Sequence, residues 1–257
     1  MSPTILVLGF IAGATILIGL PIGRIRQPAP TLRTILNAGA VGVLLFLVWD
    51  VLSHAWEPID AALVARPVPP AIILFAGLFV VGLVVGLLGV ALFEKRWLRR
   101  QAAPELPPRR LALLMAVAIG LHNFAEGLAI GQSAASGELA LAGVLVIGFA
   151  LHNATEGFGI VAPLAGAPDR PSWRFLLLLG AIGGGPTLLG TLVGSLFVSV
   201  ALSVLFLALA AGSIIFVIIQ LLGMLARARR TELTAAGILV GMIAGFATDA
   251  ILTVGGA

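Results

Sequence analysis

The sequence predicts an all-α, polytopic membrane protein with eight transmembrane helices in a 3+2+3 inverted-repeat arrangement. Three observations predict this fold: the chain is very apolar, its basic residues fall in alternate loops, and its two end thirds resemble each other. Of its 257 residues, 60% are hydrophobic and 10% charged, whereas soluble domains have roughly 45–50% and 25%. The mean hydropathy is +1.16. So few charges cannot cover this apolar surface in water, so lipid must be the solvent for most of the chain.

Eight apolar segments are each long enough to cross a bilayer, which takes about 20 residues for about 30 Å of hydrocarbon. Prolines fall between these segments, where helices tend to end. The first segment has no basic stretch before it, so we interpret it as a retained span and not as a signal peptide. The expected spans are residues 4–23, 34–53, 71–93, 111–132, 138–162, 174–194, 198–223 and 233–254.

Positive charges separate the two sides of this predicted topology. Fourteen of the fifteen Lys and Arg residues follow spans one, three, five or seven, and only Arg66 falls on the other side. The positive-inside rule makes the basic side cytoplasmic, so we expect a multi-pass protein of the cell (inner) membrane with both termini outside. The basic residues of these loops account for the isoelectric point near 11.2 without a nucleic-acid partner. We expect the loops to lie against anionic lipid headgroups.

The first and last thirds of the chain resemble each other. The stretch from Leu8 reads LGFIAGATILIGLPIG, and the stretch from Leu179 reads LGAIGGGPTLLGTLVG. Weaker matches begin at Gly42 and Gly212, and at Ala76 and Ala236. Matching spans lie five apart and cross in opposite directions, as in many secondary transporters whose substrate site lies at the repeat interface. We expect one transporter domain over residues 1–257, with repeats at about 4–93 and 174–254 around a central pair at 111–162.

A polar motif, L-H-N-x-x-E-G, occurs once in each central span. His and Glu at positions i and i+4 share one helix face, one turn apart. A buried carboxylate costs about 2.5–3.5 kcal/mol on insertion scales, so two copies of the motif argue against a purely structural role. Cysteine is absent, which excludes thiolate sites. The candidate metal ligands are His122, Asn123 and Glu126 in span four, and His152, Asn153 and Glu156 in span five.

Imidazole, carboxylate and amide oxygen suit zinc and other first-row divalent ions. With this chemistry in place, the motifs, the eight spans and the repeat resemble the ZIP (Zrt-/Irt-like) family, whose span-four motif is H-N-x-P-E-G. The resemblance implies uptake of Zn²⁺, or of Fe²⁺, Mn²⁺ or Cd²⁺, into the cytoplasm, with the six motif residues as ligands. The ion would then be the transported substrate of a protein that has no cofactor and is not an enzyme.

The chain departs from the family pattern at several positions. Ala125 and Thr155 replace the motif proline, so we expect any kink to come from glycines of the central spans: Gly127, Gly131, Gly157 and Gly159. Many family members carry further polar side chains where this chain has Gly185 and Gln220, which argues against a second metal site. Straight helices joined by a turn near residue 135 would place the motifs about 12 Å apart in depth. Sharing one ion therefore requires a bend or an asymmetric turn.

Other polar residues and other functions stay open. His54 and Glu57 fit either a site where an ion is captured or an interfacial helix end, and Asp50 and Asp249 fit either cation capture or helix capping. Two further function classes remain: an intramembrane metalloenzyme that activates water, and a sensor or scaffold that does not transport. A monomer and a homodimer are both compatible with the sequence.

Overall fold

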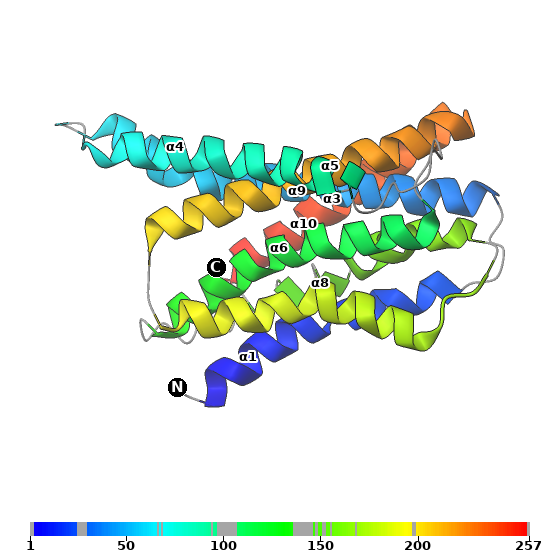
Figure 1. The fold of residues 1–257 in the computed structure, drawn as a ribbon, viewed down its shortest axis with the longest axis horizontal. Coiled ribbons are helices and arrows are strands. Elements are labelled where there is room, and N and C mark those ends of the chain that lie inside the picture. The colour runs from blue at the N-terminus through cyan, green and yellow to red at the C-terminus, as the bar shows by residue number, and fades with distance from the viewer. Residues whose placement is uncertain are drawn as a thin grey trace.

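The computed structural model describes residues 3–24, 30–65, 67, 69–93, 95–96, 107–135, 146, 149–150, 153–154, 156–167, 169–196 and 199–255. Every regular element in these ranges is a helix, which confirms the all-α class (Figure 1). The elements are α1 (Pro3–Ala14), α2 (Ile16–Gly19), η1 (Leu20–Arg24), α3 (Pro30–Val64), α4 (Ala71–Val84), η2 (Val85–Gly89), α5 (Val90–Phe93), α6 (Pro108–Ala135), η4 (Ala162–Gly166), α8 (Trp173–Gly194), α9 (Val200–Ala228) and α10 (Thr231–Gly255).

Six helical segments in the described part of the chain are long and apolar enough to cross a membrane, and α10 adds a shorter apolar stretch, Thr231–Ala247. The protein is therefore a multi-pass membrane protein. These seven segments correspond to seven of the expected spans. The remaining one, 138–162, falls mostly on residues outside the description, so the count of eight stays a prediction. The six are Pro3–Arg24, Pro30–Val64, Ala71–Leu92, Pro108–Gln132, Trp173–Gly194 and Val200–Ala228.

The helix of the second expected span, α3, is longer than the sequence predicts. The expected span ended at residue 53, but α3 continues through Pro58 to Val64. Hydropathy marks only the apolar part of a helix, and one proline removes a single backbone donor without ending the helix here. His54 therefore lies within α3, where its Nδ1 is 2.9 Å from the Asp50 carbonyl oxygen and 3.4 Å from Asp50 Oδ1.

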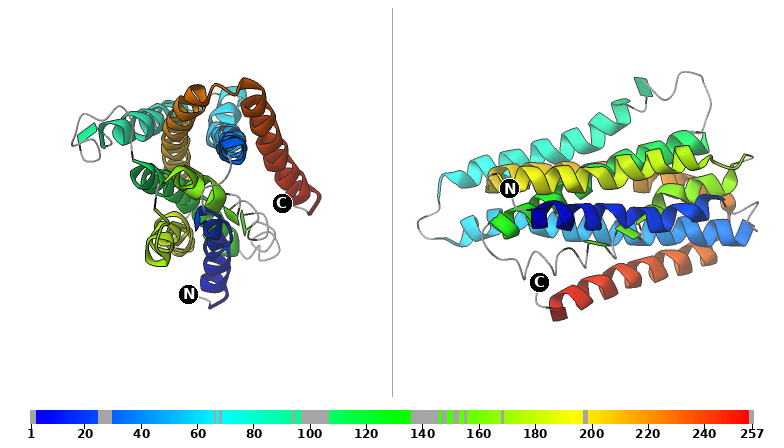
Figure 2. Two further views of the ribbon diagram at one scale, coloured as in Figure 1. Left: turned by 90° about the vertical axis from the view of Figure 1, so that its right-hand side faces the viewer. Right: turned by 90° about the horizontal axis from the view of Figure 1, so that it is seen from below.

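The helices run roughly along one axis, and close backbone contacts hold them together (Figures 1 and 2). Helix α6 packs along α8, and α8 also contacts α1. On the other side of α6, α9 contacts α3 and α4, while α10 packs against α3. Glycine permits this approach because bare backbones can touch: a Cβ at Gly190 would overlap the Phe124 carbonyl oxygen, and a Cβ at Gly42 would overlap that of Ile238.

The basic ends of several helices meet at one end of the bundle. Arg24 Nη1 donates to the Pro171 carbonyl oxygen at 2.5 Å, and Arg230 Nη1 donates to Thr31 Oγ1 at 2.6 Å. The Arg24 guanidinium also lies 4.7 Å from the ring centroid of Trp173. Both chain termini lie toward the opposite end (Figure 1). The assignment of the basic end to the cytoplasm stays a prediction.

Candidate metal-ion site

The first polar motif lies in the middle of α6. This helix is continuous from Pro108 to Ala135, so His122 and Glu126 lie one turn apart on the same face. Their side chains are in contact, with Nε2 of His122 3.1 Å from Oε1 of Glu126. Both side chains and that of Asn123 are buried. The expected glycine kink does not interrupt the α-helical course of α6.

The second motif reaches the first at the same depth. Asn153 and Glu156 are helical and buried, while His152 lies outside the described residues. Oε1 of Glu156 is 3.8 Å from Nε2 of His122. The two motifs therefore meet, as a bent helix or an asymmetric turn allows, and do not lie about 12 Å apart in depth as straight helices with a turn near residue 135 would place them. His122 faces carboxylates from two different segments of the chain.

Both motif asparagines use their amide group in the same way. Nδ2 of Asn123 donates to the Gly183 carbonyl oxygen of α8 at 2.9 Å, and Nδ2 of Asn153 donates to the Ala12 carbonyl oxygen of α1 at 2.9 Å. Because the NH2 group of each asparagine makes this contact, the carbonyl oxygen of the same amide remains available as an acceptor or ligand. Within the described part of the chain, Oδ1 of each asparagine is buried and accepts no hydrogen bond.

The two carbonyl acceptors occupy matching positions of the sequence repeats. Ala12 is the fifth residue of the stretch that begins at Leu8, and Gly183 is the fifth residue of the stretch that begins at Leu179. The donors are also equivalent, since each is the asparagine of its own motif. The register read from the sequence therefore matches the register of the hydrogen bonds.

The motif glycines follow the same register. A Cβ at Gly127 would overlap the Thr187 carbonyl oxygen of α8, and a Cβ at Gly157 would overlap that of Ile16 in α2. Thr187 and Ile16 are again matching positions, each the ninth residue of its aligned stretch. Each motif therefore packs against its neighbouring repeat through two equivalent backbone contacts.

The two repeats also contact each other directly, through α1 and α8. Gly13 and Gly184 occupy matching positions in the aligned stretches. A Cβ at either glycine would overlap the carbonyl oxygen of the other. Two elements related by a two-fold axis contact each other at equivalent positions. The crossing point of α1 and α8 has this property, because it lies at equivalent residues of the two stretches.

The site offers donors at a spacing that suits a metal ion. Bonds of about 2.1 Å in tetrahedral geometry place two ligand atoms about 3.4 Å apart. The two contacts of His122 Nε2, 3.1 Å to Glu126 and 3.8 Å to Glu156, lie on either side of this value. The oxygens of Glu156 are also buried. No three His, Asp or Glu side chains of the described ranges form a ready metal-holding group. Amide oxygens or His152 would therefore have to complete the shell.

Sequence reasoning missed Thr187, which follows Pro186 in α8. Its side chain is buried, and its Oγ1 has no hydrogen-bond partner in the described part of the chain. It lies beside Gly127, the residue after Glu126. Thr187 lies one helical turn after Gly183, the residue whose carbonyl Asn123 contacts. The sequence alone does not give the register between α6 and α8, so it could not identify this hydroxyl.

The remaining candidates make other contacts, and one of them, Asp50, also lies near enough to His122 to interact with it electrostatically. Gly185 is exposed, and a Cβ there would meet nothing within 4 Å. Gln220 is half-buried on α9, and Asp249 is half-buried on α10. Asp50 contacts His54 within α3. A Cβ at Gly159 would reach only ordinary contacts at 3.9 Å, so this glycine is not needed for close packing.

The fold and the cluster define a multi-pass α-helical membrane protein with a buried His, Asn and Glu site. No protein-family model matches the chain. The chain is 28% identical over 263 residues to a protein named zinc transporter ZupT from Shigella dysenteriae serotype 1 (strain Sd197), a match that covers 97% of this chain and 98% of that protein. A protein of the same name from Escherichia coli O81 (strain ED1a) has the same identity and coverage. The similarity extends over the whole length of these transporters, so it includes every span described above.

Proposed function

We propose that the chain transports divalent transition-metal ions, zinc first, across the membrane into the cytoplasm, as a transporter of the ZIP type. The ion would bind at His122, Asn123 and Glu126 of α6 and at His152, Asn153 and Glu156 of the neighbouring segment. Full-length similarity to proteins named zinc transporters supports the class of function. Fe²⁺, Mn²⁺ and Cd²⁺ are the alternative substrates, because the same nitrogen and oxygen ligands suit them.

One observation carries the choice of site: a single buried imidazole lies between two carboxylates from different segments. Oε1 of Glu126 and Oε1 of Glu156 are 3.1 Å and 3.8 Å from Nε2 of His122. Ionisable groups inside a membrane are expensive and usually line an ion pathway. His122 lies near the midpoint of α6, which fits a substrate site near the middle of the bilayer. The ligands include no thiolate, so the ion can also be released.

The paired contacts support a single domain of residues 1–257 built as an inverted repeat. Each motif asparagine contacts a helix from a different repeat, and the two acceptors are matching positions of the repeated sequence. In such folds one repeat moves against the other around a fixed site. We infer that α1 and α8 are the equivalent helices that hold the two motifs in register. The central pair at 111–162 would then lie between repeats at about 4–93 and 174–254.

The direction of transport and the orientation follow from the resemblance and the charges. The basic end of the bundle would face the cytoplasm under the positive-inside rule, with both termini outside and the protein in the cell (inner) membrane. The ion would exchange water for protein ligands on the outer side and leave toward the basic end. The relatives are named as transporters, which supports a function other than catalysis.

Zinc flux into proteoliposomes tests the proposal directly. The wild type is compared with Glu126→Ala/Glu156→Ala, and with Asp60→Ala/Asp169→Ala as a control that removes two exposed carboxylates. We expect flux to disappear in the first double variant and to persist in the second, with both proteins folded and inserted. A correctly oriented wild type that moves none of Zn²⁺, Mn²⁺, Fe²⁺ or Cd²⁺ would overturn the proposal in favour of a sensor or enzyme.

A further inference from the structure

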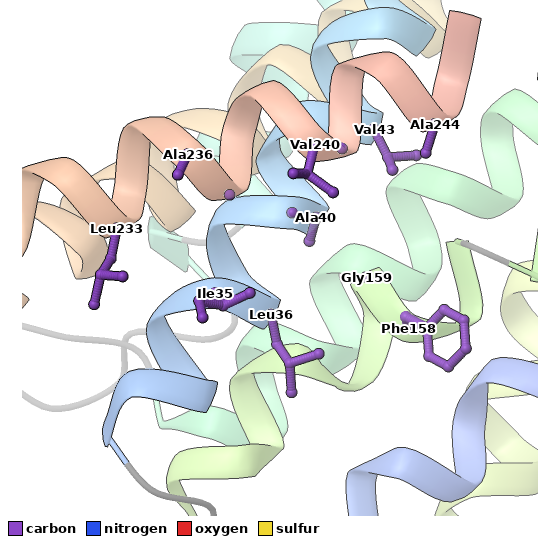
Figure 3. A pocket seen from close by; sticks show the side chains of 13 residues that line it. Ile35, Leu36, Ala40, Val43, Phe158, Gly159, Leu233, Ala236, Val240 and Ala244 are labelled. Atoms are coloured by element: carbon purple, nitrogen blue, oxygen red, sulfur yellow. The ribbon is translucent and has the colours of Figure 1, made fainter. Parts of the chain in front are cut away.

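An apolar groove lies between α3, α10 and the helical segment that follows Glu156. It has a volume of about 400 Å³ and is lined by 13 residues of α3, α10 and the helical segment 156–161. Figure 3 shows Leu233, Ala236 and Val240 of α10 along one side and Phe158 and Gly159 across from them. None of the lining side chains is polar or charged. The groove therefore suits hydrocarbon.

The length of the groove matches one leaflet of a bilayer. Its α10 lining runs from Leu233 to Ala244, a stretch that rises about 16 Å at about 1.5 Å per residue. Half of a hydrocarbon core of about 30 Å is about 15 Å. Because α10 begins at the basic end of the bundle, the groove would lie in the leaflet on that side.

A charged pocket adjoins the groove at this end. Leu233 lines both cavities, and the second is lined otherwise by Arg229, Arg230, Thr231 and Glu232. The two arginines outnumber the one carboxylate, so the pocket is net positive. Arg229 is exposed and ends α9 in the left-handed conformation, at φ 50° and ψ 37°. Glycine is the usual residue at this place because a Cβ is strained there, so an arginine here points to a use for its charge.

We propose that the groove and pocket together bind an anionic phospholipid from the leaflet at the basic end. One acyl chain lies along α10 between Leu233 and Ala244, and the phosphate lies at Arg229 and Arg230. A net positive pocket beside hydrocarbon matches the charge and the order of parts in such a lipid. The proposal is independent of metal transport.

The dimensions favour a lipid chain over a second copy of the protein. An α-helix with its side chains is about 10 Å across, much wider than a single acyl chain, so a helix of a second copy would enter the groove only with its side chains. Glycine and alanine line much of the groove, including Gly39, Ala40 and Gly159. These small residues leave the helix backbones open to contact by a flexible acyl chain.

Filling the groove tests the acyl-chain half of the proposal. At Gly39 a new Cβ would meet only the Gly237 carbonyl oxygen, at 3.9 Å, so Gly39→Leu adds a side chain to the groove without a clash at its Cβ. Gly77→Leu is the matched control, because nothing lies within 4 Å of a Cβ there. Native mass spectrometry of the detergent-purified protein with added phosphatidylglycerol should show lipid adducts on the wild type and Gly77→Leu. We expect them to be at least about fivefold fewer on Gly39→Leu.

Replacing the arginine tests the headgroup half. Arg229→Gly should raise or preserve the unfolding temperature without lipid, because glycine relieves the left-handed strain. It should weaken phosphatidylglycerol binding about fivefold, from one cation near an anionic headgroup. Arg230→Gln should weaken it similarly. Arg174→Gln, which removes a charge on α8, should not, and phosphatidylcholine should bind more weakly than phosphatidylglycerol throughout.

Two outcomes would overturn the lipid site. Equal phosphatidylglycerol binding in Gly39→Leu, Arg229→Gly and wild type would place the lipid elsewhere on the protein surface. A wild-type dimer that Gly39→Leu splits into monomers would show that a second copy fills the groove. Metal flux enters neither result, so failure here leaves the transport proposal standing.

Discussion

Among their described residues, the two copies of the polar motif agree in the contacts of their asparagines and glycines and differ in the place of their glutamates. Both asparagines donate to a backbone carbonyl of a neighbouring helix, and both motif glycines lie against a backbone. The glutamates differ. Glu126 contacts the histidine of its own motif, whereas Glu156 contacts His122 of the other copy.

The comparison suggests that some residues of this short motif position the helices and that others would bind the ion. Asparagine and glycine fix the position of each helix against its neighbouring repeat, and those contacts are duplicated along the chain. The histidine and glutamates, which would hold the ion, converge on one point. Under the proposed function, the repeat would supply a symmetric frame, and metal binding would depend on how the two motifs meet at His122.

The largest expected effect comes from the side chain that both copies share. His122→Ala removes the group that faces both carboxylates, so we expect zinc flux to fall by more than about 100-fold, beyond the roughly 10–100-fold typical of losing a supporting residue. His54→Ala is the comparison variant, because it removes the exposed imidazole that contacts Asp50 within α3, and we expect it to lower flux much less. Proteoliposome uptake measures both variants. Undiminished flux in His122→Ala would show that His122 is not the ligand on which the two motifs converge.

The next effect compares the two glutamates. Glu126→Gln and Glu156→Gln each keep side-chain size and remove a charge next to His122, so each should weaken zinc binding by at least about tenfold. Zinc binding to purified protein by calorimetry measures the losses. Because both glutamates contact one histidine, a double-mutant cycle with His122→Ala should be non-additive for each. Additive losses for Glu156 alone would mean that it serves a separate site.

Much of the fold follows from elementary properties of the sequence. Apolar length and proline placement correctly predicted seven helices that the structure contains, because hydrocarbon thickness imposes a length on each span. The predicted end of the second span was wrong, because α3 continues past its apolar part, through Pro58 to Val64. The spans alone do not reveal such an extension, since hydrogen bonding within a helix does not depend on hydropathy.

The candidate site was partly predictable. Spacing along one helix correctly placed His122 beside Glu126, because i and i+4 share a face. The meeting of His122 with Glu156 depends on the relative depth of two segments, which the number of connecting residues does not determine. The asparagine contacts with Gly183 and Ala12 were also out of reach, because a backbone acceptor leaves no signature in the sequence.

A smaller effect should follow from adding a methyl group at the motif glycines. Gly127→Ala and Gly157→Ala would each place a Cβ against a carbonyl oxygen of a neighbouring helix. We expect each to lower the free energy of unfolding by about 1–3 kcal/mol, as overpacked cores do. Thermal unfolding in detergent measures the change. Gly185→Ala is the control, because open space surrounds that position and alanine favours a helix. Equal stability of all three variants would show that the helices are not in backbone contact.

The smallest effect should come from the asparagine amides and should be the same in both copies. In Asn123→Ala and Asn153→Ala one hydrogen bond is lost, but the acceptor carbonyl still lies in a helix, and Thr15 Oγ1 also donates to that of Ala12. We therefore expect each variant to lose only the net value of a hydrogen bond, about 0.5–1.5 kcal/mol of unfolding free energy. Denaturation in mixed micelles measures both. If the two losses differ by more than their own size, α1 and α8 do not hold the motifs equivalently, and the inverted-repeat proposal loses its support. If they match while zinc binding still weakens, the free amide oxygens act as ligands, because a lost tether alone would change stability and leave metal affinity unaltered.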